Sequence, residues 1–448
     1  MFLFTSEASV LTARSDGLRV SAAGDGRKLR EIRAHGAALV WTADPFTVLR
    51  EDYKEILLQV RRPRIDPEPI CELRWRPEEG TVIFRRRWSG EFCAYVSQQD
   101  GRKGMRLPET IIASHLKLAP LLLQKAARRW HKIKPGHEMR LRAGRLSLNK
   151  QCSWAAPFRM NYKETVCEVR RLVLESVASV QAGSALLLSG GIDSSAVAAA
   201  MHVTGKTVHP FTFGLRRPVR PQQEWESDLT CSHRVAAHLH LPVTEILLRP
   251  NALVRNVPMG IYLAETPRGT IVDDCVALIE VAKKIAAAGY TEVLMGEAAD
   301  DLFGSFKFAL QYYRGQQLRA YYRTQLIRNL PDELAIIQNV FAWFGISVIQ
   351  PLWTKELLRI GYNLPLHYRL DKGRLMKQVL RDAFAPDLPP EIVRRPKCVT
   401  RDSTQIRHVL ENEFGTDRER YRALFRIMMG LRKQWPRRLH QLLKNCRN

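Results

Sequence analysis

The sequence contains no run of about 18 consecutive apolar residues, so we expect no membrane-spanning helix. Near its start it carries Glu7 and lacks a basic segment followed by a long apolar core, so we expect no signal peptide. Its eight cysteines are scattered without a Cys-x-x-Cys pair, which argues against a zinc site and a disulfide framework. These absences predict a cytoplasmic protein with reduced thiols.

Acidic residues are few beside the basic ones: 45 aspartates and glutamates face 70 lysines and arginines, for a net charge of +25. Such an excess attracts polyanions or acidic proteins, although no nucleic-acid-binding motif is visible and a basic composition alone also produces it. The 448 residues suffice for two or three domains, and 45% hydrophobic residues indicate a globular chain. The basic clusters are Arg85–Arg87, Arg128–Arg129, Arg216–Arg217, Arg394–Arg395 and the tail from Arg432 to Arg447.

The most informative segment is Ser189–Ser195, with the letters SGGIDSS. It follows the apolar run Ala185–Leu188, which predicts a buried strand, and precedes the alanine-rich run Ala196–Met201, which predicts a helix. Glycines at such a turn let the backbone approach a ligand, and free N–H groups at a helix start attract an anion. Asp193 would repel a phosphate unless it holds a metal ion, so Mg²⁺ is implied.

A second turn, Gly296–Gly304, is rich in carboxylates and follows the predicted strand Thr291–Met295. Sheets of α/β proteins place ligands at the carboxyl ends of their strands. Strands alternate with helices along this part of the chain, which predicts a parallel, doubly wound sheet. Beyond Phe308 the pattern is helical, and we expect its aromatics to be mainly core, with one or two lining a substrate: Tyr312, Tyr313, Tyr321, Tyr322, Phe341 and Trp343.

These motifs together resemble the asparagine synthetase family of the ATP pyrophosphatase superfamily. The first turn is similar to the pyrophosphate loop of enzymes that cleave ATP to AMP and pyrophosphate, and the second to the family's GExxD turn. Lys377–Arg381 is similar to a KxxLR helix, and Leu388–Lys397 to a segment that ends in RPK. The likeness covers roughly residues 160–400 in the right order; Phe344–Leu352 departs from it, because Ser347 and Ile349 replace an acidic residue and an arginine.

The resemblance implies ATP and Mg²⁺ as cofactors, with Asp193 and Asp300 holding the metal ion on the phosphates. It places Glu297 beside the reacting carbonyl, as the candidate base, and Lys397 where a cation stabilises the acyl-adenylate. The residues implied for ATP and pyrophosphate binding are Ser189, Gly190, Gly191, Asp193, Ser194, Ser195, Phe213, Gly214, Gly296 and Lys377.

The first 155 residues are expected to form a β-rich, degenerate glutaminase-like domain, because Ile133–Leu146 resembles the closing hairpin of such domains. Glutaminase domains use a cysteine directly after the initiator methionine, where this sequence has Phe2 and no cysteine before Cys71. A thiol such as Cys93 lacks the free α-amine that an N-terminal nucleophile needs. Residues 156–448 are expected to form the ATP-binding, amide-forming domain, with a helical C-terminal part and a basic tail.

The resemblance leaves the substrate open. We favour a macrolactam cyclase of ribosomal peptides, similar to lasso peptide cyclases, followed by a β-lactam or carbapenam synthetase and an ammonia-dependent amide ligase. β-Lactam synthetases carry a tyrosine where this chain has Glu297, which disfavours the second. A different class would be an RNA-modifying relative, for which the net charge is the argument. The expected partners are a peptide or small amino-acid carboxylate and, for the first alternative, a leader-peptide-binding protein and a peptidase.

Overall fold

The computed structural model describes residues 153–304, 307–369, 376–416 and 419–428, and before them 2–5, 29–34, 37–42, 47–51, 55–60, 71–76, 78–79, 81–89, 95–98, 110–113, 131–142 and 145–151. Two compact units divide the chain, Met1–Ser153 with Ala423–Asn448, and Trp154–Arg422. The sequence prediction had grouped all residues after 155 together. Cys93, Arg128–Arg129 and the basic tail from Arg432 lie outside the described residues.

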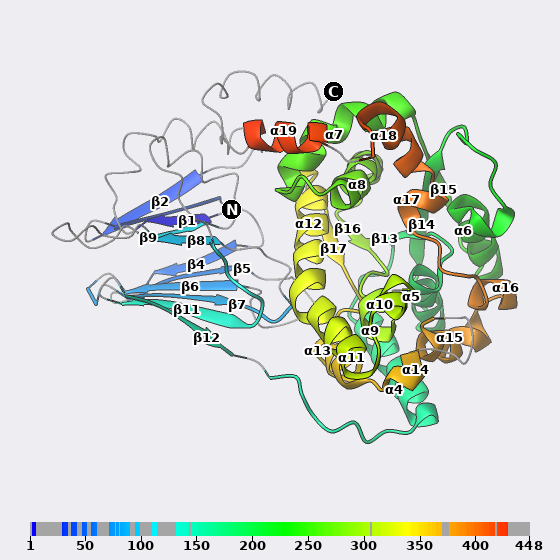
Figure 1. Ribbon diagram of the computed structural model, residues 1–448, viewed down its shortest axis with the longest axis horizontal. Coiled ribbons are helices and arrows are strands. Elements are labelled where there is room, and N and C mark those ends of the chain that lie inside the picture. The colour runs from blue at the N-terminus through cyan, green and yellow to red at the C-terminus, as the bar shows by residue number, and fades with distance from the viewer. Residues whose placement is uncertain are drawn as a thin grey trace. The chain divides into compact units, whose positions relative to one another are not determined.

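The first unit contains two six-stranded sheets, with the strand orders β10-β8-β9-β1-β3-β2 and β12-β11-β7-β6-β5-β4 (Figure 1). All pairings described in them are antiparallel. The region is therefore β-rich, and the expected hairpin is present as β11 and β12; its likeness to a glutaminase domain stays a prediction. The strands are β1 (Phe2–Thr5), β2 (Leu29–Ala34), β3 (Ala37–Thr42), β4 (Thr47–Glu51), β5 (Ile56–Val60), β6 (Cys71–Arg76), β7 (Thr81–Arg86), β8 (Tyr95–Gln98), β9 (Thr110–Ala113), β10 (His131–Lys132), β11 (His137–Arg142) and β12 (Arg145–Lys150).

The basic cluster Arg85–Arg87 is not a uniform surface patch. Arg86 is only 2% exposed, and its Nη1 donates to the main-chain oxygen of Ile133 at 2.6 Å. Arg85, on the opposite face of β7, donates to Glu138 at 2.5 Å. Alternate residues of a strand point to opposite faces, so Arg86 makes an internal contact and Arg85 makes an ion pair with the buried carboxylate of Glu138.

The second unit is built on a sheet whose strands pair in parallel, as predicted, and five strands form it in the order β15-β14-β13-β16-β17 (Figure 1). The first strand of the unit, β13, lies between β14 and β16. The chain adds β14 and β15 on one side of β13 and then β16 and β17 on the other, so its winding reverses between β13 and β16. Ligands of doubly wound sheets bind at such a reversal, beyond the carboxyl ends of the strands. The strands are β13 (Ser184–Leu187), β14 (Val208–Leu215), β15 (Thr244–Leu248), β16 (Glu292–Leu294) and β17 (Ser347–Ile349).

Helices make up most of the rest of this unit, the last of them continuing past Arg422 into residues grouped with the first unit, and the described part after Gly304 is mainly helical, as expected. They include α4 (Tyr162–Ala178), α5 (Ile192–Val203), α6 (Asp228–His238), α7 (Pro250–Ala264), α8 (Gly269–Ala287), α9 (Ala299–Phe303), α10 (Lys307–Tyr312), α11 (Gly315–Thr324), α12 (Leu330–Trp343), α13 (Lys355–Asn363), α14 (Leu366–Arg369), α15 (Gln378–Phe384), α16 (Pro390–Val393), α17 (Thr400–Ser403), α18 (Ile406–Phe414) and α19 (Glu419–Met428), with single turns at Glu224–Glu226, Gln325–Asn329 and Ala385–Asp387. Among the described residues, every helix is too short or too polar to cross a bilayer.

The core beside the sheet uses small residues where a helix approaches closely. Ala196–Ala200 of α5 are fully buried, and the strand β13 that precedes the helix is buried throughout. Alanine leaves room for close packing and favours the helix. Of the six aromatics singled out above, Tyr322 and Phe341 are core residues, whereas Tyr312 is 73% exposed.

The helix α4 begins with a capping box. The side chain of Asn161 accepts from the backbone N–H of Glu164 at 2.9 Å, and the Glu164 carboxylate accepts from the N–H of Asn161 at 2.8 Å. Val169, Val173 and Val177 recur at helical spacing and are buried. The cap therefore fixes where this amphipathic helix starts before it enters the core.

We expect Asn161→Ala to lower the free energy of unfolding by about 1 kcal/mol, because a helix-start N–H loses its acceptor. Urea unfolding followed by circular dichroism measures this. Cys167→Ala, on the exposed side of the same helix, is the control and should change the free energy of unfolding by less than about 0.5 kcal/mol. Equal losses in the two variants would contradict a capping role.

Candidate active site

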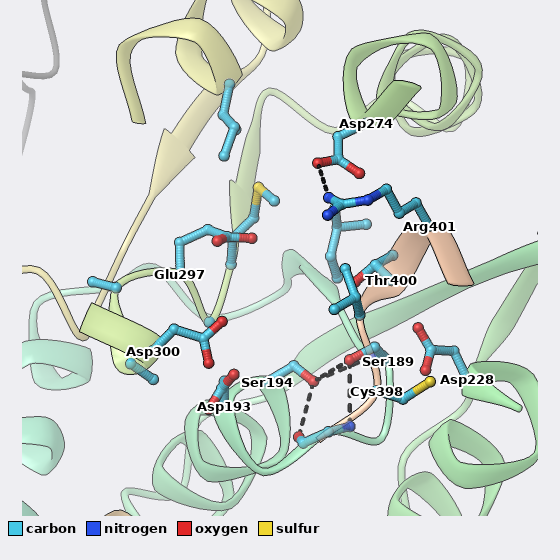
Figure 2. A pocket seen from close by; sticks show the side chains of 18 of the residues that line it. Ser189, Asp193, Ser194, Asp228, Asp274, Glu297, Asp300, Cys398, Thr400 and Arg401 are labelled. Carbon is cyan, nitrogen blue, oxygen red and sulfur yellow. Dashed lines mark hydrogen bonds and ion pairs between the residues drawn. The ribbon is translucent and has the colours of Figure 1, made fainter. Parts of the chain in front are cut away.

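The loop between β13 and α5 is folded by its own hydroxyl groups (Figure 2). The Ser194 hydroxyl accepts from the backbone N–H of Ser189 at 3.1 Å, and the two serine hydroxyls are 3.1 Å apart. The N–H of Gly191 donates to the Ser189 hydroxyl at 3.3 Å. Gly191 is the N-cap of α5, and no side chain caps this helix start. The first N–H groups of the helix are thus available for an anionic ligand.

Two glycines are required by close backbone contacts. Gly190 has φ of +67°, and a Cβ there would lie 2.4 Å from the main-chain carbon of Cys231. A Cβ on Gly296 would lie 2.5 Å from the backbone nitrogen of Ser194 and 2.6 Å from the carbonyl carbon of Asp193. The turn after β16 therefore lies directly on the loop after β13, which no larger residue at 296 would permit.

Two non-glycine residues at the site adopt left-handed backbone conformations. Ala298, in the turn after β16, has φ of +79°, and Lys377, at the N-cap of α15, has φ of +64°. Such residues cost about 1–3 kcal/mol each and concentrate at functional sites, where the surrounding structure holds them. The left-handed conformation of Ala298 orients the acidic turn, and that of Lys377 orients the lysine at the start of α15.

Two carboxylates, of Asp193 and Asp300, contact two ammonium groups, of Lys377 and Lys397, at this site. Lys377 Nζ donates to Asp193 Oδ1 at 2.6 Å and forms an ion pair with Asp300. Lys397 Nζ donates to Asp300 Oδ2 at 2.7 Å and lies 3.9 Å from Asp193 Oδ2. Lys377 is only 1% exposed, whereas the other three side chains remain partly open to the cavity. A buried ammonium is tolerated here because two carboxylates share it.

These contacts shift the pKa values of the two groups nearest the acidic turn. Burial alone would raise the pKa of Asp300, but Lys377 and Lys397 outweigh it and hold that pKa well below its usual range. Burial alone would lower the pKa of Lys397, but Asp300 and Asp193 keep that pKa above its usual value. Both groups are therefore charged at neutral pH.

Glu297 has the opposite character. Burial first, and then the negative charge of Asp300, raises the pKa of Glu297 to about 7, with Asp193 and Asp274 adding to the rise and Lys397 opposing it. A carboxyl group with a pKa near neutrality can accept and release a proton at little cost. Of the acidic residues at this turn, Glu297 is suited to proton transfer and Asp300 to fixed charge.

The donor set fits a magnesium ion that arrives with phosphates. Asp193 and Asp300 both contact the same ammonium group, so their oxygens converge on one point. Among the described residues, no group of three or more His, Cys, Asp or Glu side chains could hold a metal ion. Mg²⁺ commonly uses one or two carboxylates and completes its shell with water and substrate phosphates. Two carboxylates beside an anion-binding helix start suit that arrangement.

A cavity of about 700 Å³ joins these groups. Most of the residues singled out from the sequence line it: Ser189, Gly191, Asp193, Ser194, Phe213, Gly296, Glu297, Asp300, Lys377 and Lys397. Gly190, Ser195 and Gly214 are absent from its lining. Gly190 and Gly214 instead face α6 of the same chain: Gly190 lies against Cys231, and a Cβ on Gly214 would lie 2.9 Å from Leu229. None of the six aromatic residues proposed from the sequence lines the cavity.

The far wall of the cavity is mainly apolar and comes from α8 and α12. Its residues include Ile271, Cys275, Leu278, Leu330, Leu334, Ile336 and Ile337. The polar groups on this side are Thr270, Asp274 and Glu333, with Arg401 at 3.3 Å from the Asp274 carboxylate (Figure 2). Sequence reasoning missed this wall, because its residues lie on two helices far along the chain from the loop at Ser189.

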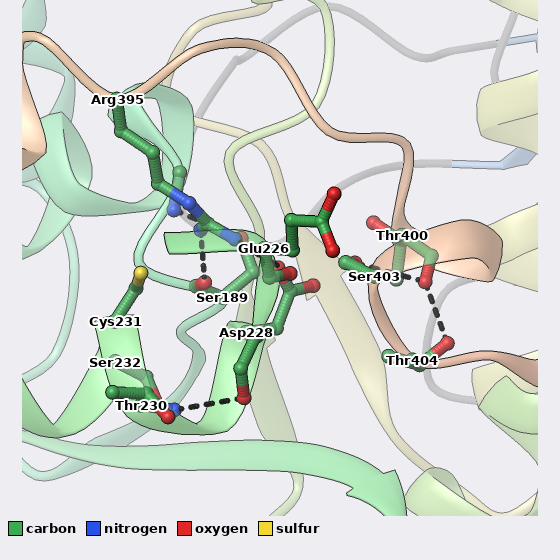
Figure 3. A network of polar contacts seen from close by, with 12 residues as sticks. Ser189, Glu226, Asp228, Thr230, Cys231, Ser232, Arg395, Thr400, Ser403 and Thr404 are labelled. Carbon is green, nitrogen blue, oxygen red and sulfur yellow. Dashed lines mark hydrogen bonds and ion pairs between the residues drawn. The ribbon is translucent and has the colours of Figure 1, made fainter. Parts of the chain in front are cut away.

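Sequence reasoning also missed a buried polar network behind the loop (Figure 3). Arg395 is 5% exposed and donates to the main-chain oxygen of Ser189 at 2.9 Å and to Asp228 at 2.8 Å. Arg394–Arg395 is one of the basic clusters of the sequence, but only Arg394 is exposed. Asp228 had no local signal, since its partner lies 167 positions away.

Comparison with known proteins supports the motifs. A family model described as Asparagine synthase matches residues 168–343 and 314–425. Asparagine synthetase [glutamine-hydrolyzing] 1 of Lotus japonicus is 28% identical over 234 residues, which are 47% of this chain and 38% of that protein. The probable asparagine synthetase of Schizosaccharomyces pombe is 28% identical over 245 residues, 47% of this chain and 42% of that protein.

The matched region spans less than half the length of these curated relatives. Among solved structures, NMN synthetase from Francisella tularensis is 15% identical, with a TM-score of 0.30, and covers 64% of this chain and 93% of its own. NH3-dependent NAD synthetase from Campylobacter jejuni is 16% identical, with a TM-score of 0.28 and the same coverages.

We expect Gly296→Ala to weaken ATP binding at least about tenfold, because the added Cβ pushes the acidic turn away from the loop at Ser194. Isothermal titration calorimetry measures the binding. Gly289→Ala is the control: nothing lies within 4 Å of the added Cβ, so it carries only the backbone strain of a φ of +86° and no clash with a neighbouring loop. Unchanged affinity in Gly296→Ala, or equal losses in both variants, would contradict the contact between the loops.

Proposed function

The chain belongs to the asparagine synthase family, and from that premise we propose that it is an ATP-dependent carbon–nitrogen ligase that releases AMP and pyrophosphate. The observation that carries the proposal is the cluster of Asp193, Asp300, Lys377 and Lys397 beside an uncapped helix start at the winding reversal of a parallel sheet. This site offers both an anion-binding loop and positive charges that can balance the negative charge of a departing pyrophosphate.

In the first step a substrate carboxylate attacks the α-phosphorus of ATP, and the bond from that phosphorus to the bridging oxygen of pyrophosphate breaks. The N–H groups at the start of α5 hold the pyrophosphate, whose growing negative charge Lys377 balances. Mg²⁺, when bound by Asp193 and Asp300, supplies further charge neutralisation on the phosphates. The product is an acyl-adenylate, held in a cavity that limits access of water.

In the second step an amine attacks the acyl carbon, and the bond to the AMP oxygen breaks. Glu297 accepts the proton that the amine loses, for which its pKa near neutrality suits it. Lys397, charged at neutral pH, stabilises the negative charge on the carbonyl oxygen and on the departing AMP. The amide nitrogen thus comes from whichever amine the cavity admits.

The substrate we favour is a peptide that supplies both groups, so that the product is a macrolactam of the lasso peptide type. The apolar wall from α8 and α12 supports this, because free aspartate is small and doubly carboxylated. In their ionised forms Glu297, Asp274 and Glu333 would repel its second carboxylate, and Arg401 is already paired with Asp274. An apolar peptide segment that presents one carboxylate and one amine suits this wall better. A leader-peptide-binding protein and a peptidase would be its partners.

We expect the purified protein to exchange pyrophosphate into ATP with a precursor peptide bearing an internal Asp or Glu. Aspartate and a β-amino-acid precursor of β-lactams form the rest of the panel, and exchange with either would redirect the proposal to that substrate class. Asp193→Ala should lower the exchange at least about 100-fold, because a phosphate-side charge is lost. Glu391→Ala, which removes an exposed carboxylate, is the control. No exchange with any acid in the presence of Mg²⁺ would contradict the ligase proposal.

The rate of amide formation should rise with pH through about 7, because Glu297 accepts a proton only in its ionised form. In Glu297→Gln this rise should disappear, leaving only the titration of the substrate amine, and kcat should fall about 10²- to 10⁴-fold. Stopped assays over about pH 5.5 to 9 measure this pH profile. The control Glu391→Gln should retain the rise of the rate with pH. A rise that survives in Glu297→Gln would assign the base to another group.

A further inference from the structure

Two buried arginines connect the chain segments that carry the site's lysines. Arg381 and Arg395 are 2% and 5% exposed. Arg381 Nε donates to the main-chain oxygen of Met376 at 2.7 Å, directly before Lys377. Its Nη2 donates to the main-chain oxygen of Arg395 at 3.0 Å, and its Nη1 to that of Val393. One guanidinium group thus joins the segment before Lys377 to the segment before Lys397.

Arg395 continues the connection to the loop after β13 (Figure 3). Its Nη1 donates to the main-chain oxygen of Ser189 at 2.9 Å. Its Nη2 donates to the Asp228 carboxylate at 2.8 Å and to the main-chain oxygen of Glu226 at 3.2 Å, at the start of α6. The network therefore runs from the loop through Arg395 and Arg381 to both lysines.

Both arginines border the cavity, and both are held by several hydrogen bonds to the chain itself. All three nitrogens of Arg381 donate to main-chain oxygens, and both terminal nitrogens of Arg395 donate to the chain. A guanidinium held in this way keeps a fixed place, because moving it toward a ligand would give up contacts that satisfy it while it is buried. Position is therefore what these contacts supply.

We propose that Arg381 and Arg395 are positioning residues, which hold the ammonium groups of Lys377 and Lys397 against Asp193 and Asp300 in register with the phosphate loop. The five planar N–H donors of arginine make this possible, because one group bridges several carbonyl oxygens in fixed directions. A lysine at either position would keep the positive charge but would lose the several N–H donors that the guanidinium group directs at fixed angles. The effect on turnover rests on the proposed function, whereas the effect on the loop does not.

The chain offers a matched control in Arg170. This residue also joins distant segments, since it donates to the main-chain oxygen of Ala383 at 2.7 Å and to Asp387 Oδ1 at 3.1 Å. It does not line the cavity. A purely structural loss should therefore appear in Arg170→Lys and Arg395→Lys alike, and a positioning effect only in the latter.

The kinetic test compares Arg395→Lys, Lys397→Gln and their double variant. Arg395→Lys should lower kcat about tenfold or more and change KM for ATP less than about threefold, since a displacement near 1 Å already costs catalysis heavily. If it acts through Lys397, adding it to Lys397→Gln should cost less than about threefold more. Arg170→Lys should keep kcat within about twofold, even where its Tm falls equally. Multiplicative losses in the double variant, or an equal loss in Arg170→Lys, would overturn the proposal.

Hydrogen exchange without substrate provides a test that does not depend on turnover. In Arg395→Lys the amides of residues 190–195, Lys397 and Cys398 should exchange at least about threefold faster, and in Arg170→Lys they should not, because local opening reports local contacts. Unchanged protection in Arg395→Lys would contradict the proposal. A wild-type protein that fails to exchange pyrophosphate would instead count against the ligase proposal, and hydrogen exchange would still decide the role of Arg395.

Discussion

The site depends on one shared ammonium group, that of Lys377, held between Asp193 and Asp300. The two carboxylates belong to the first turns of α5 and α9, the helices that follow the neighbouring strands β13 and β16, and without a cation they would repel each other at this separation. Removing Lys377 or either carboxylate would leave a buried charge without a partner, which strongly destabilises a folded protein. This contact therefore fixes the two segments relative to each other. The left-handed backbone at Lys377 and the bare backbone of Gly296 are what the contact requires.

Much of this architecture could be predicted because its signals are local. The strand before Ser189, the helix after it and the alternation of strands and helices around them follow from contiguous runs of apolar and small residues. Gly190 and Gly296 stood out for the same reason, since each belongs to a short motif. The parallel sheet then brings the two loops together, because the carboxyl ends of neighbouring parallel strands lie at the same edge.

What the sequence concealed depends on contacts between distant residues. Arg395 and Asp228 are separated by 167 positions, and an arginine beside another arginine resembles a surface cluster until burial is known. The apolar wall from α8 and α12 reads as ordinary helix core, because helical periodicity does not distinguish a side chain facing a cavity from one facing another helix. The aromatics after Phe308 show the converse, as Tyr312 looked like core and is exposed.

The described residues that border the proposed nucleotide site and its apolar wall belong to one of the two compact units, Trp154–Arg422. Substitutions in the two antiparallel sheets of the other unit leave these side chains as they are. The chemistry and the remainder of the chain can therefore diverge at different rates. A lineage could exchange what surrounds such a unit, and with it the molecules presented to the cavity, while keeping the same charges around the phosphates.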